Sequence, residues 1–164
     1  MLALVQTLYT AEVTAKNGRN GHVRSSDGSV DLDLSAPPAL GGTGKPGANP
    51  EQLFAVGYAA CFQSALLGVA RGRKLDASDS RIVATVGIGP TGQGGFGLQV
   101  SLDLHAPHLS HEDARATSHR QTARKVMSAN GIEPSLFVVS SERDFTFASS
   151  LAISPLFPMT RKGP

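Results

Sequence analysis

The sequence predicts a single-domain α+β fold in which short antiparallel strands dominate and two helices are inserted between them. Several short stretches alternate between apolar and polar residues, which is typical of half-buried strands. The chain has 18 glycines and 10 prolines among 164 residues, which favours turns and short strands over a helical bundle. We therefore expect one domain over residues 1–148 and a loose tail over residues 149–164, which contains three prolines.

The first elements are predicted strands joined by tight turns. Residues 8–16 are expected to form a strand, and residues 22–25 a second one. Between them Asn17-Gly18 and Asn20-Gly21 flank Arg19, which is a strong turn signal.

Residues 30–34 alternate between apolar and acidic side chains, which predicts a half-buried strand with one wet face. The Pro- and Gly-rich residues 36–48 are expected to form an ordered loop.

A long helix is predicted from Asn49 to about Gly72. Asn49 is a good N-cap, Pro50 suits the first helical position, and Gln52 can close a capping box. The middle of this helix is rich in small residues, which allow another element to approach closely, so we expect it to be central and buried. These residues are Ala55, Gly57, Ala59, Ala60, Ser64, Ala65 and Gly68.

The second half of the chain predicts a hairpin, a helix and a strand. Residues 81–88 and 96–104 alternate clearly and are separated by a glycine-rich turn. Ser110 and Asp113 resemble a capping box that opens a helix ending near Ala129, and a last strand is expected over residues 136–147. The predicted order is β-β-β-α-β-β-α-β.

Composition argues against several classes of protein. The net charge of +2 is too weak and too scattered to indicate nucleic-acid binding. No stretch approaches 18 consecutive apolar residues, so no transmembrane helix is expected, and the opening residues do not resemble a signal peptide. With a single cysteine the chain can form no internal disulfide, and the cytoplasm is the expected location.

No bound cofactor or metal is expected. Gly87, Gly89 and Gly92 match a dinucleotide fingerprint, but a strand rather than a helix follows them. His105, His108 and His111 are spaced like metal ligands. They fall on a strand end, a turn and a helix cap. Because these elements point in different directions, we expect that the three histidines do not bind one metal ion.

Cys61 is the one residue whose chemistry the sequence leaves open. A free cysteine in an apolar helix is usually a small buried hydrophobe. It acts as a nucleophile only where its surroundings favour the thiolate, and spacing alone cannot distinguish these two roles.

Four stretches together resemble a known family. They are NPEQLFAVGYAACF over residues 49–62, LYTAEVTAKNGRNGHVRSSDG over 8–28, LDLSAPPALGGTGKPGANPEQLF over 32–54 and VGIGPTGQGGFGL over 86–98. In this order they resemble the organic hydroperoxide resistance proteins, a branch of the osmotically inducible, OsmC-like family. The resemblance covers roughly residues 7–115. It implies an intertwined homodimer in which antiparallel sheets wrap around two central helices.

The resemblance also implies three site residues. Cys61 matches the cysteine that attacks the peroxide, Arg19 matches the arginine that faces its thiolate, and Glu51 matches the carboxylate that holds the arginine in place. A guanidinium near a thiolate favours the charged form and can stabilise the leaving alkoxide. Glu51 precedes Cys61 by ten residues, about 15 Å along an ideal helix, so positioning Arg19 is the role left for it.

The chain departs from the family near its C-terminus. The family carries a second cysteine in a segment similar to VCPYSNATRGN, whereas this chain reads KVMSANGIEPSLFVV and has Met127 at about that position. An oxidised Cys61 would then need an external thiol, and the resemblance makes a dihydrolipoyl group on a lipoylated protein the first candidate. The expected substrates are alkyl or fatty-acid hydroperoxides. The alternatives are a non-catalytic homologue that senses redox state or binds a hydrophobic ligand, and a structural remnant with an inert cysteine.

Overall fold

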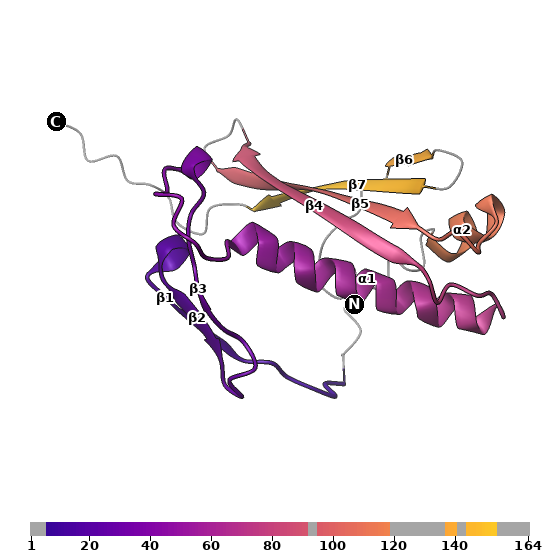
Figure 1. The fold of residues 1–164 in the computed structure, drawn as a ribbon, viewed down its shortest axis with the longest axis horizontal. Helices are drawn as coiled ribbons and strands as arrows, with labels where there is room; N and C mark the ends of the chain where they lie inside the picture. Colours follow the sequence, from indigo (N-terminus) through magenta and orange to yellow (C-terminus); the bar gives the residue numbers. More distant parts are fainter. Residues whose placement is uncertain (1–5, 92–94, 119–136, 141–143, 154–164) are drawn as a thin grey trace. The chain divides into compact units, whose positions relative to one another are not determined.

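The computed structural model describes residues 6–91, 95–118, 137–140 and 144–153. In that part of the chain two antiparallel sheets and two α-helices follow one another in the order β-β-β-α-β-β-α-β-β (Figure 1). The elements are β1 (Val13–Lys16), β2 (His22–Ser25), β3 (Asp31–Asp33), α1 (Pro50–Gly72), β4 (Arg81–Pro90), β5 (Phe96–His105), α2 (His111–Ser118), β6 (Phe137–Ser140) and β7 (Asp144–Ile153). Short 3₁₀ turns, η1 (Gly18–Asn20) and η2 (Pro38–Leu40), lie in the first half. The predicted α+β class is confirmed.

Contacts within the chain group it into two compact units. The N-terminal unit is Met1–Leu53 and the C-terminal unit is Phe54–Pro164. The first contains the β1-β2-β3 sheet, and the second contains the β4-β5-β7-β6 sheet and most of α1. The expectation of a single domain over residues 1–148 stays a prediction.

The sheet of the N-terminal unit is a meander of short strands. β2 has the predicted bounds, and β1 pairs with it from Val13 to Lys16. The expected first strand was too long at its start. β2 offers four partner residues in the ladder, and beyond it the Ser26 N–H donates to the Glu12 carbonyl at 3.0 Å without extending the strand to residue 8.

β3 is also shorter and more exposed to solvent than the alternation predicts. Its ladder with β2 covers Asp31–Asp33, and Leu34 next to it is buried. Val30 and Leu32 are exposed, however, although the apolar face of a half-buried strand should cover them. The following loop is ordered as expected, and Leu34 bridges to Ala48 at its far end.

Helix α1 has the predicted bounds but is less buried than expected. Among its residues only Phe62, Leu66 and Ala70 are buried, and their spacing of four places them along one side of the helix. By length and composition alone, α1 is long and apolar enough to cross a membrane. Core helices of soluble proteins also meet this criterion. The expectation of no transmembrane helix therefore stays a prediction.

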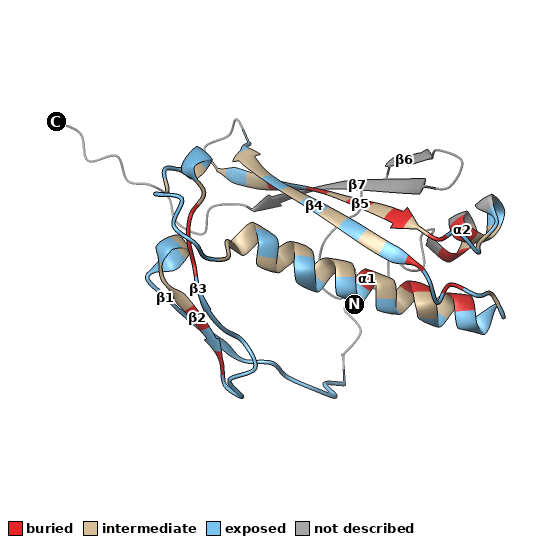
Figure 2. Ribbon diagram, in the orientation of Figure 1, coloured by how far each residue is buried: buried red, intermediate tan, exposed pale blue. Residues whose placement is uncertain are grey.

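The hydrophobic core of the C-terminal unit lies between α1 and the larger sheet (Figure 2). Phe62 and Leu66 of α1 cluster with Leu102 and Leu104 of β5 and with Ala114 of α2. Every second residue of β5 is buried from position 98 to 104, so one face of the strand contributes to the core. The predicted β4–β5 hairpin is confirmed over ten paired residues on each strand.

Helix α2 begins at the predicted capping box. The Ser110 hydroxyl lies 2.6 Å from an Asp113 carboxylate oxygen, and the Asp113 N–H donates to the Ser110 hydroxyl at 3.1 Å. The helix is described to Ser118, and its expected end near Ala129 lies outside the described residues.

The C-terminal prediction was wrong in two respects. Residues 136–147 were expected to form one strand, but they contribute to two antiparallel strands, β6 and β7. The stretch contains no Gly, Pro or Asn to mark a reversal, so its alternation looks continuous. Residues 149–153, expected to belong to a loose tail, are the end of β7, which pairs with β5 as far as Ile153. Residues 154–164 lie outside the described part.

Replacing Leu66 with alanine should lower the free energy of unfolding by about 2–5 kcal/mol, because it leaves a cavity in the core. Urea denaturation followed by circular dichroism measures this change. Val83→Ala is the matched control, since Val83 is 53% exposed and should change stability little. Equal losses in both variants would contradict the assigned core.

Candidate active site

Arg19 is held by a strained turn between β1 and β2. Asn17 and Gly18 both adopt left-handed conformations, with φ of 58° and 57°. Gly21 ends the 3₁₀ turn, where a Cβ atom would lie 1.8 Å from the carbonyl oxygen of Lys16. Only glycine fits at position 21, so the two Asn-Gly pairs specify this turn closely.

The same turn is attached to the segment that follows β3. The Asn20 side-chain oxygen accepts a hydrogen bond from the Ala36 N–H at 3.0 Å, and the Leu34 N–H donates to the Gly21 carbonyl at 2.8 Å. These bonds hold the C-terminal end of the turn, which limits where Arg19 can reach.

Glu51 lies in the first turn of α1, where the predicted capping box is formed. The Asn49 N–H donates to the Gln52 side-chain oxygen, and the Gln52 N–H donates to the Asn49 side-chain oxygen, both at 2.9 Å. A carboxylate at a helix N-terminus is also favoured by the helix dipole.

Arg19 and Glu51 form a bidentate ion pair. Arg19 Nη1 donates to Glu51 Oε2 at 2.9 Å, and Nη2 donates to Oε1 at 2.8 Å. The Glu51 side chain is 11% exposed and that of Arg19 is 39% exposed. The hydrogen bonds from Arg19 lower the pKa of Glu51, and those to Glu51 raise the pKa of Arg19, each against the opposing effect of burial. Such a fork fixes the guanidinium plane as well as its charge.

The ion pair makes stability depend on pH in a defined direction. Because the pKa of Glu51 is lowered in the folded protein, its contribution is fully present above its usual pKa of 4.5 and is lost as pH falls through the lowered value. Glu51→Gln should therefore reduce the free energy of unfolding by about 1 kcal/mol at neutral pH, and this difference should shrink as pH falls below 4.5. Urea titrations at neutral pH and at a pH well below 4.5 test this.

Glu12→Gln is the control for this experiment, since Glu12 is an exposed carboxylate in the same unit. If the free energy of unfolding of the Glu51→Gln variant differed from that of the unmodified protein by the same amount at both pH values, the role of the ion pair would be contradicted.

Cys61 lies on α1 next to the core but outside it. Its thiol is exposed, whereas the following residue, Phe62, is almost completely buried. Gly57 and Ser64 lie one turn before and after Cys61 and are also exposed. At these two neighbouring positions the surface of α1 beside Cys61 is therefore built from small side chains.

The structure brings Arg19 and Glu51 together within the N-terminal unit, and Cys61 belongs to the C-terminal unit. The expected contact between Arg19 and the Cys61 sulfur stays a prediction, as do the roles of all three residues. Of the nearby aromatic residues, Phe62 lies in the core and Tyr58 packs against it. Tyr58 also stacks on Phe54, with ring centroids 5.6 Å apart.

One cluster of charged residues was missed in the sequence. Lys16, His22 and Arg24 line a hollow on the β1–β3 sheet. The alternation of the strands placed each residue on a face, but only the pairing register shows that these faces coincide. Of the predicted histidine set, His108 lies 3.4 Å from an Asp79 carboxylate oxygen. Within the described residues no group of three ligands suited to a metal was found.

Comparisons with known proteins agree on one family. The family described as OsmC-like protein matches residues 42–140. An organic hydroperoxide resistance protein of Xanthomonas axonopodis pv. citri is 50% identical over 105 residues, which cover 63% of this chain and 73% of the relative. Organic hydroperoxide resistance protein OhrA of Bacillus subtilis is 36% identical over 149 residues, which cover 86% of this chain and 95% of the relative.

Solved structures give the same result. The organic hydroperoxide resistance protein of Elizabethkingia anophelis matches with a TM-score of 0.70 and 40% identity, covering 77% of this chain and 92% of that chain. OhrB of Bacillus subtilis matches with a TM-score of 0.66 and 38% identity, covering 76% and 93%. The fold, the sequence and the residues of the N-terminal turn and α1 thus lead to one conclusion: this chain belongs to the OsmC-like family and is similar to its organic hydroperoxide resistance proteins.

Proposed function

We propose that this protein reduces organic hydroperoxides to alcohols and so contributes to resistance to oxidative stress. The observation that carries the proposal is the bidentate Arg19–Glu51 pair, a preorganised cation supplied by a turn that only this arrangement of glycines allows. The relatives named organic hydroperoxide resistance protein suggest the substrate class of alkyl or fatty-acid hydroperoxides.

The proposed reaction begins at the exposed thiol of Cys61. Its thiolate attacks one oxygen of the peroxide, so that an S–O bond forms as the O–O bond breaks. The departing alkoxide takes up a proton and leaves as the alcohol. The sulfur loses two electrons and becomes a sulfenic acid, the first step of the cysteine oxidation ladder.

Arg19 and Glu51 would serve this step by electrostatics. A guanidinium close to a thiolate stabilises its negative charge before attack and that of the alkoxide as it leaves, and this is the role we propose for Arg19. Glu51 is a positioning residue, because both of its carboxylate oxygens accept from Arg19. The arginine is therefore oriented before substrate arrives, and no reorganisation is needed during the reaction.

An external thiol must attack the sulfenic acid directly, because Cys61 is the only cysteine among 164 residues and no second one can form an internal disulfide with it. An incoming thiol displaces water from the sulfenic acid to form a mixed disulfide, and a second thiol releases Cys61 in reduced form. A dihydrolipoyl group on a lipoylated protein supplies both thiols and is the reductant we propose. No bound cofactor enters the reaction. A cytoplasmic location is consistent with it, since thiols are kept reduced there.

Cys61→Ser should abolish consumption of tert-butyl hydroperoxide in the presence of a dithiol, because serine cannot accept the peroxide oxygen. Peroxide loss can be followed by a colorimetric assay, and circular dichroism checks the fold. Ser64→Ala is the matched control, since Ser64 is an exposed small residue one turn further along α1. Peroxide consumption by the serine variant at the unmodified rate would refute the assignment.

The single cysteine also favours a second candidate, a redox sensor or hydrophobic-ligand-binding protein without turnover. The peroxidase and the redox sensor both need a reactive Cys61, so alkylation already rapid at neutral pH fits either of these two. Turnover with excess dithiol supports the enzyme. Oxidation of one Cys61 per chain without further turnover supports the sensor, and an unreactive thiol supports an inert remnant.

We also propose that two copies associate. Leu8 and Tyr9 are 91% and 79% exposed, and Val56 on α1 is 68% exposed, so each offers apolar surface that a partner could cover. A second copy of the chain is the occupant that family membership suggests.

Sedimentation velocity should therefore give a mass of twice 17.0 kDa for the unmodified chain. Val56→Glu should shift the protein toward monomer, because it places a charge in the buried interface. Glu12→Gln provides a variant with an exposed change that should leave the mass unaltered. A monomeric unmodified chain at micromolar concentration would contradict the dimer.

A further inference from the structure

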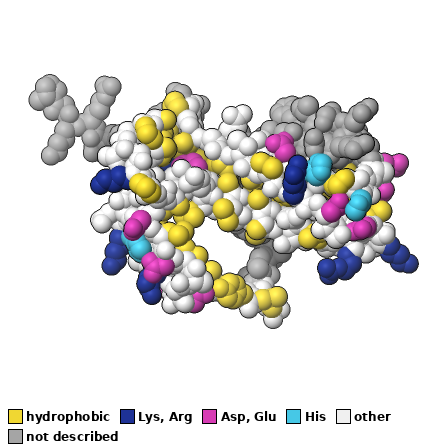
Figure 3. Space-filling model, in the orientation of Figure 1, with side chains coloured by type: hydrophobic (Ala, Val, Ile, Leu, Met, Phe, Trp, Pro, Cys, Tyr) yellow, Lys and Arg dark blue, Asp and Glu magenta, His cyan; other side chains and the backbone are white. Residues whose placement is uncertain are grey.

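One face of the β1–β3 sheet is a grid of charged side chains. In the pairing register Lys16 lies opposite His22, which lies opposite Asp33. In the neighbouring row Thr14, Arg24 and Asp31 face one another in the same way. Directly paired residues share a face of the sheet, as do residues two apart, so all six side chains project on one side. Basic, acidic and histidine side chains adjoin one another over this sheet in Figure 3.

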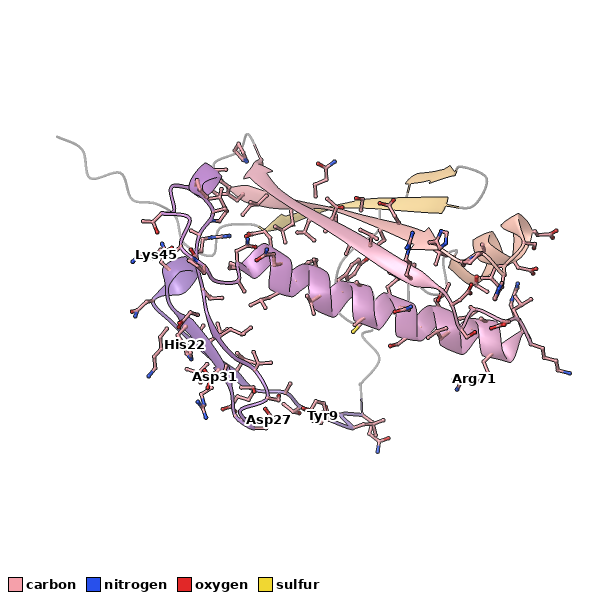
Figure 4. All side chains as sticks on the ribbon, in the orientation of Figure 1. Tyr9, His22, Asp27, Asp31, Lys45 and Arg71 are labelled. Carbon is pink, nitrogen blue, oxygen red and sulfur yellow. The ribbon has the colours of Figure 1, made fainter. Side chains whose placement is uncertain are left out.

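His22 and Arg24 are held by the two carboxylates. His22 Nδ1 lies 2.8 Å from Asp33 Oδ1, and Nε2 lies 2.8 Å from Asp31 Oδ1. Figure 4 labels His22 and Asp31 on this sheet. A neutral imidazole can donate from only one nitrogen, so two carboxylate contacts indicate the imidazolium. The hydrogen bond with Asp33 accordingly raises the pKa of His22. Arg24 Nη1 donates to Asp31 Oδ2.

The charges on this face do not balance. Lys16, His22 and Arg24 supply three cations, against two carboxylates from Asp31 and Asp33. Lys16 lies opposite another cation, which is destabilising in a strand pair. Within the described residues no ion pair or side-chain hydrogen bond to Lys16 is present. The excess positive charge therefore lies on β1, the edge strand farthest from the carboxylates of β3.

A hollow of about 350 Å³ lies at this positive side. Its lining residues are Thr14, Lys16, His22, Arg24, Ser25 and Ser26. Hydroxyl groups thus stand beside the cations. The nearby carboxylate of Asp27 accepts hydrogen bonds from Ser25 and Ser29, which lower its pKa to about 2 and engage it within the β2–β3 turn.

We propose that this hollow binds a single oxyanion group, a phosphate or a carboxylate, with Lys16 as its principal cation. The guanidinium N–H groups of Arg24 that Asp31 does not use and the hydroxyls of Thr14 and Ser26 act as further donors. The bound anion balances the charge of the grid and offsets the repulsion between Lys16 and His22. This site is independent of the proposed peroxide chemistry, since it contains none of Arg19, Glu51 and Cys61.

The test is a titration of the full chain with inorganic phosphate, followed by the amide resonances of residues 14–26 in ¹H–¹⁵N spectra. Acetate in a parallel titration distinguishes a carboxylate site from a phosphate site, and chloride at equal ionic strength controls for screening. We expect saturable shifts with one of the two oxyanions and none with chloride.

Lys16→Gln should weaken binding about three- to fivefold, the size expected for one exposed charge contact. Lys45→Gln is the matched control, an exposed lysine elsewhere in the N-terminal unit, and should bind as the unmodified chain does. Sulfate keeps a constant charge near neutral pH, so it serves for the pH series. Its affinity should fall as pH rises through the raised pKa of His22, because the imidazolium is lost.

Absence of saturable shifts with both oxyanions would overturn the proposal. So would equal losses in the two lysine variants, which would show general charge attraction rather than a site. Neither result bears on peroxide consumption, so this proposal and the proposed function fail separately.

Discussion

The bidentate contact between Arg19 and Glu51 is the interaction on which the candidate site depends. It connects a turn near the start of the chain to the first turn of a helix 32 residues later. Each partner is fixed by its own local structure, the arginine by a glycine-dependent turn and the glutamate by a capping box. Because both backbones are constrained before the side chains meet, the pair loses less conformational entropy than a pair of free surface residues would.

Helix α1 combines two tasks on one element. Its buried side carries Phe62 and Leu66 into the core, and this packing fixes the rotation of the helix about its axis. With the rotation fixed, the residue before Phe62 has to lie outside the core, and the exposed thiol at position 61 follows. The small residues around it do little for the core of the chain, which explains why a helix so apolar in composition keeps much of its surface exposed.

The sequence was most informative where local chemistry determines structure. The Asn-Gly pairs at the Arg19 turn, the capping boxes at Asn49 and Ser110, and the β4–β5 alternation all predicted elements that the structure contains. It was least informative where a partner strand decides the outcome. The length of β1 is set by β2, and the stretch from β6 to β7 contains no Gly, Pro or Asn to mark its reversal. Alternation likewise placed Lys16 and Arg24 on a face, but their convergence with His22 depends on register.

The position of β7 has a consequence for how the chain is made. β7 is the last described strand in the sequence, yet it lies inside the sheet, between β5 and β6. On the edge of β5 that β4 does not cover, Phe96 pairs with Ile153, so half of the hydrogen-bonding capacity of β5 is unmet until residues 144–153 have left the ribosome. The larger sheet therefore cannot be completed during synthesis of its first hairpin, and β5 presents an open edge to other nascent chains until β7 arrives.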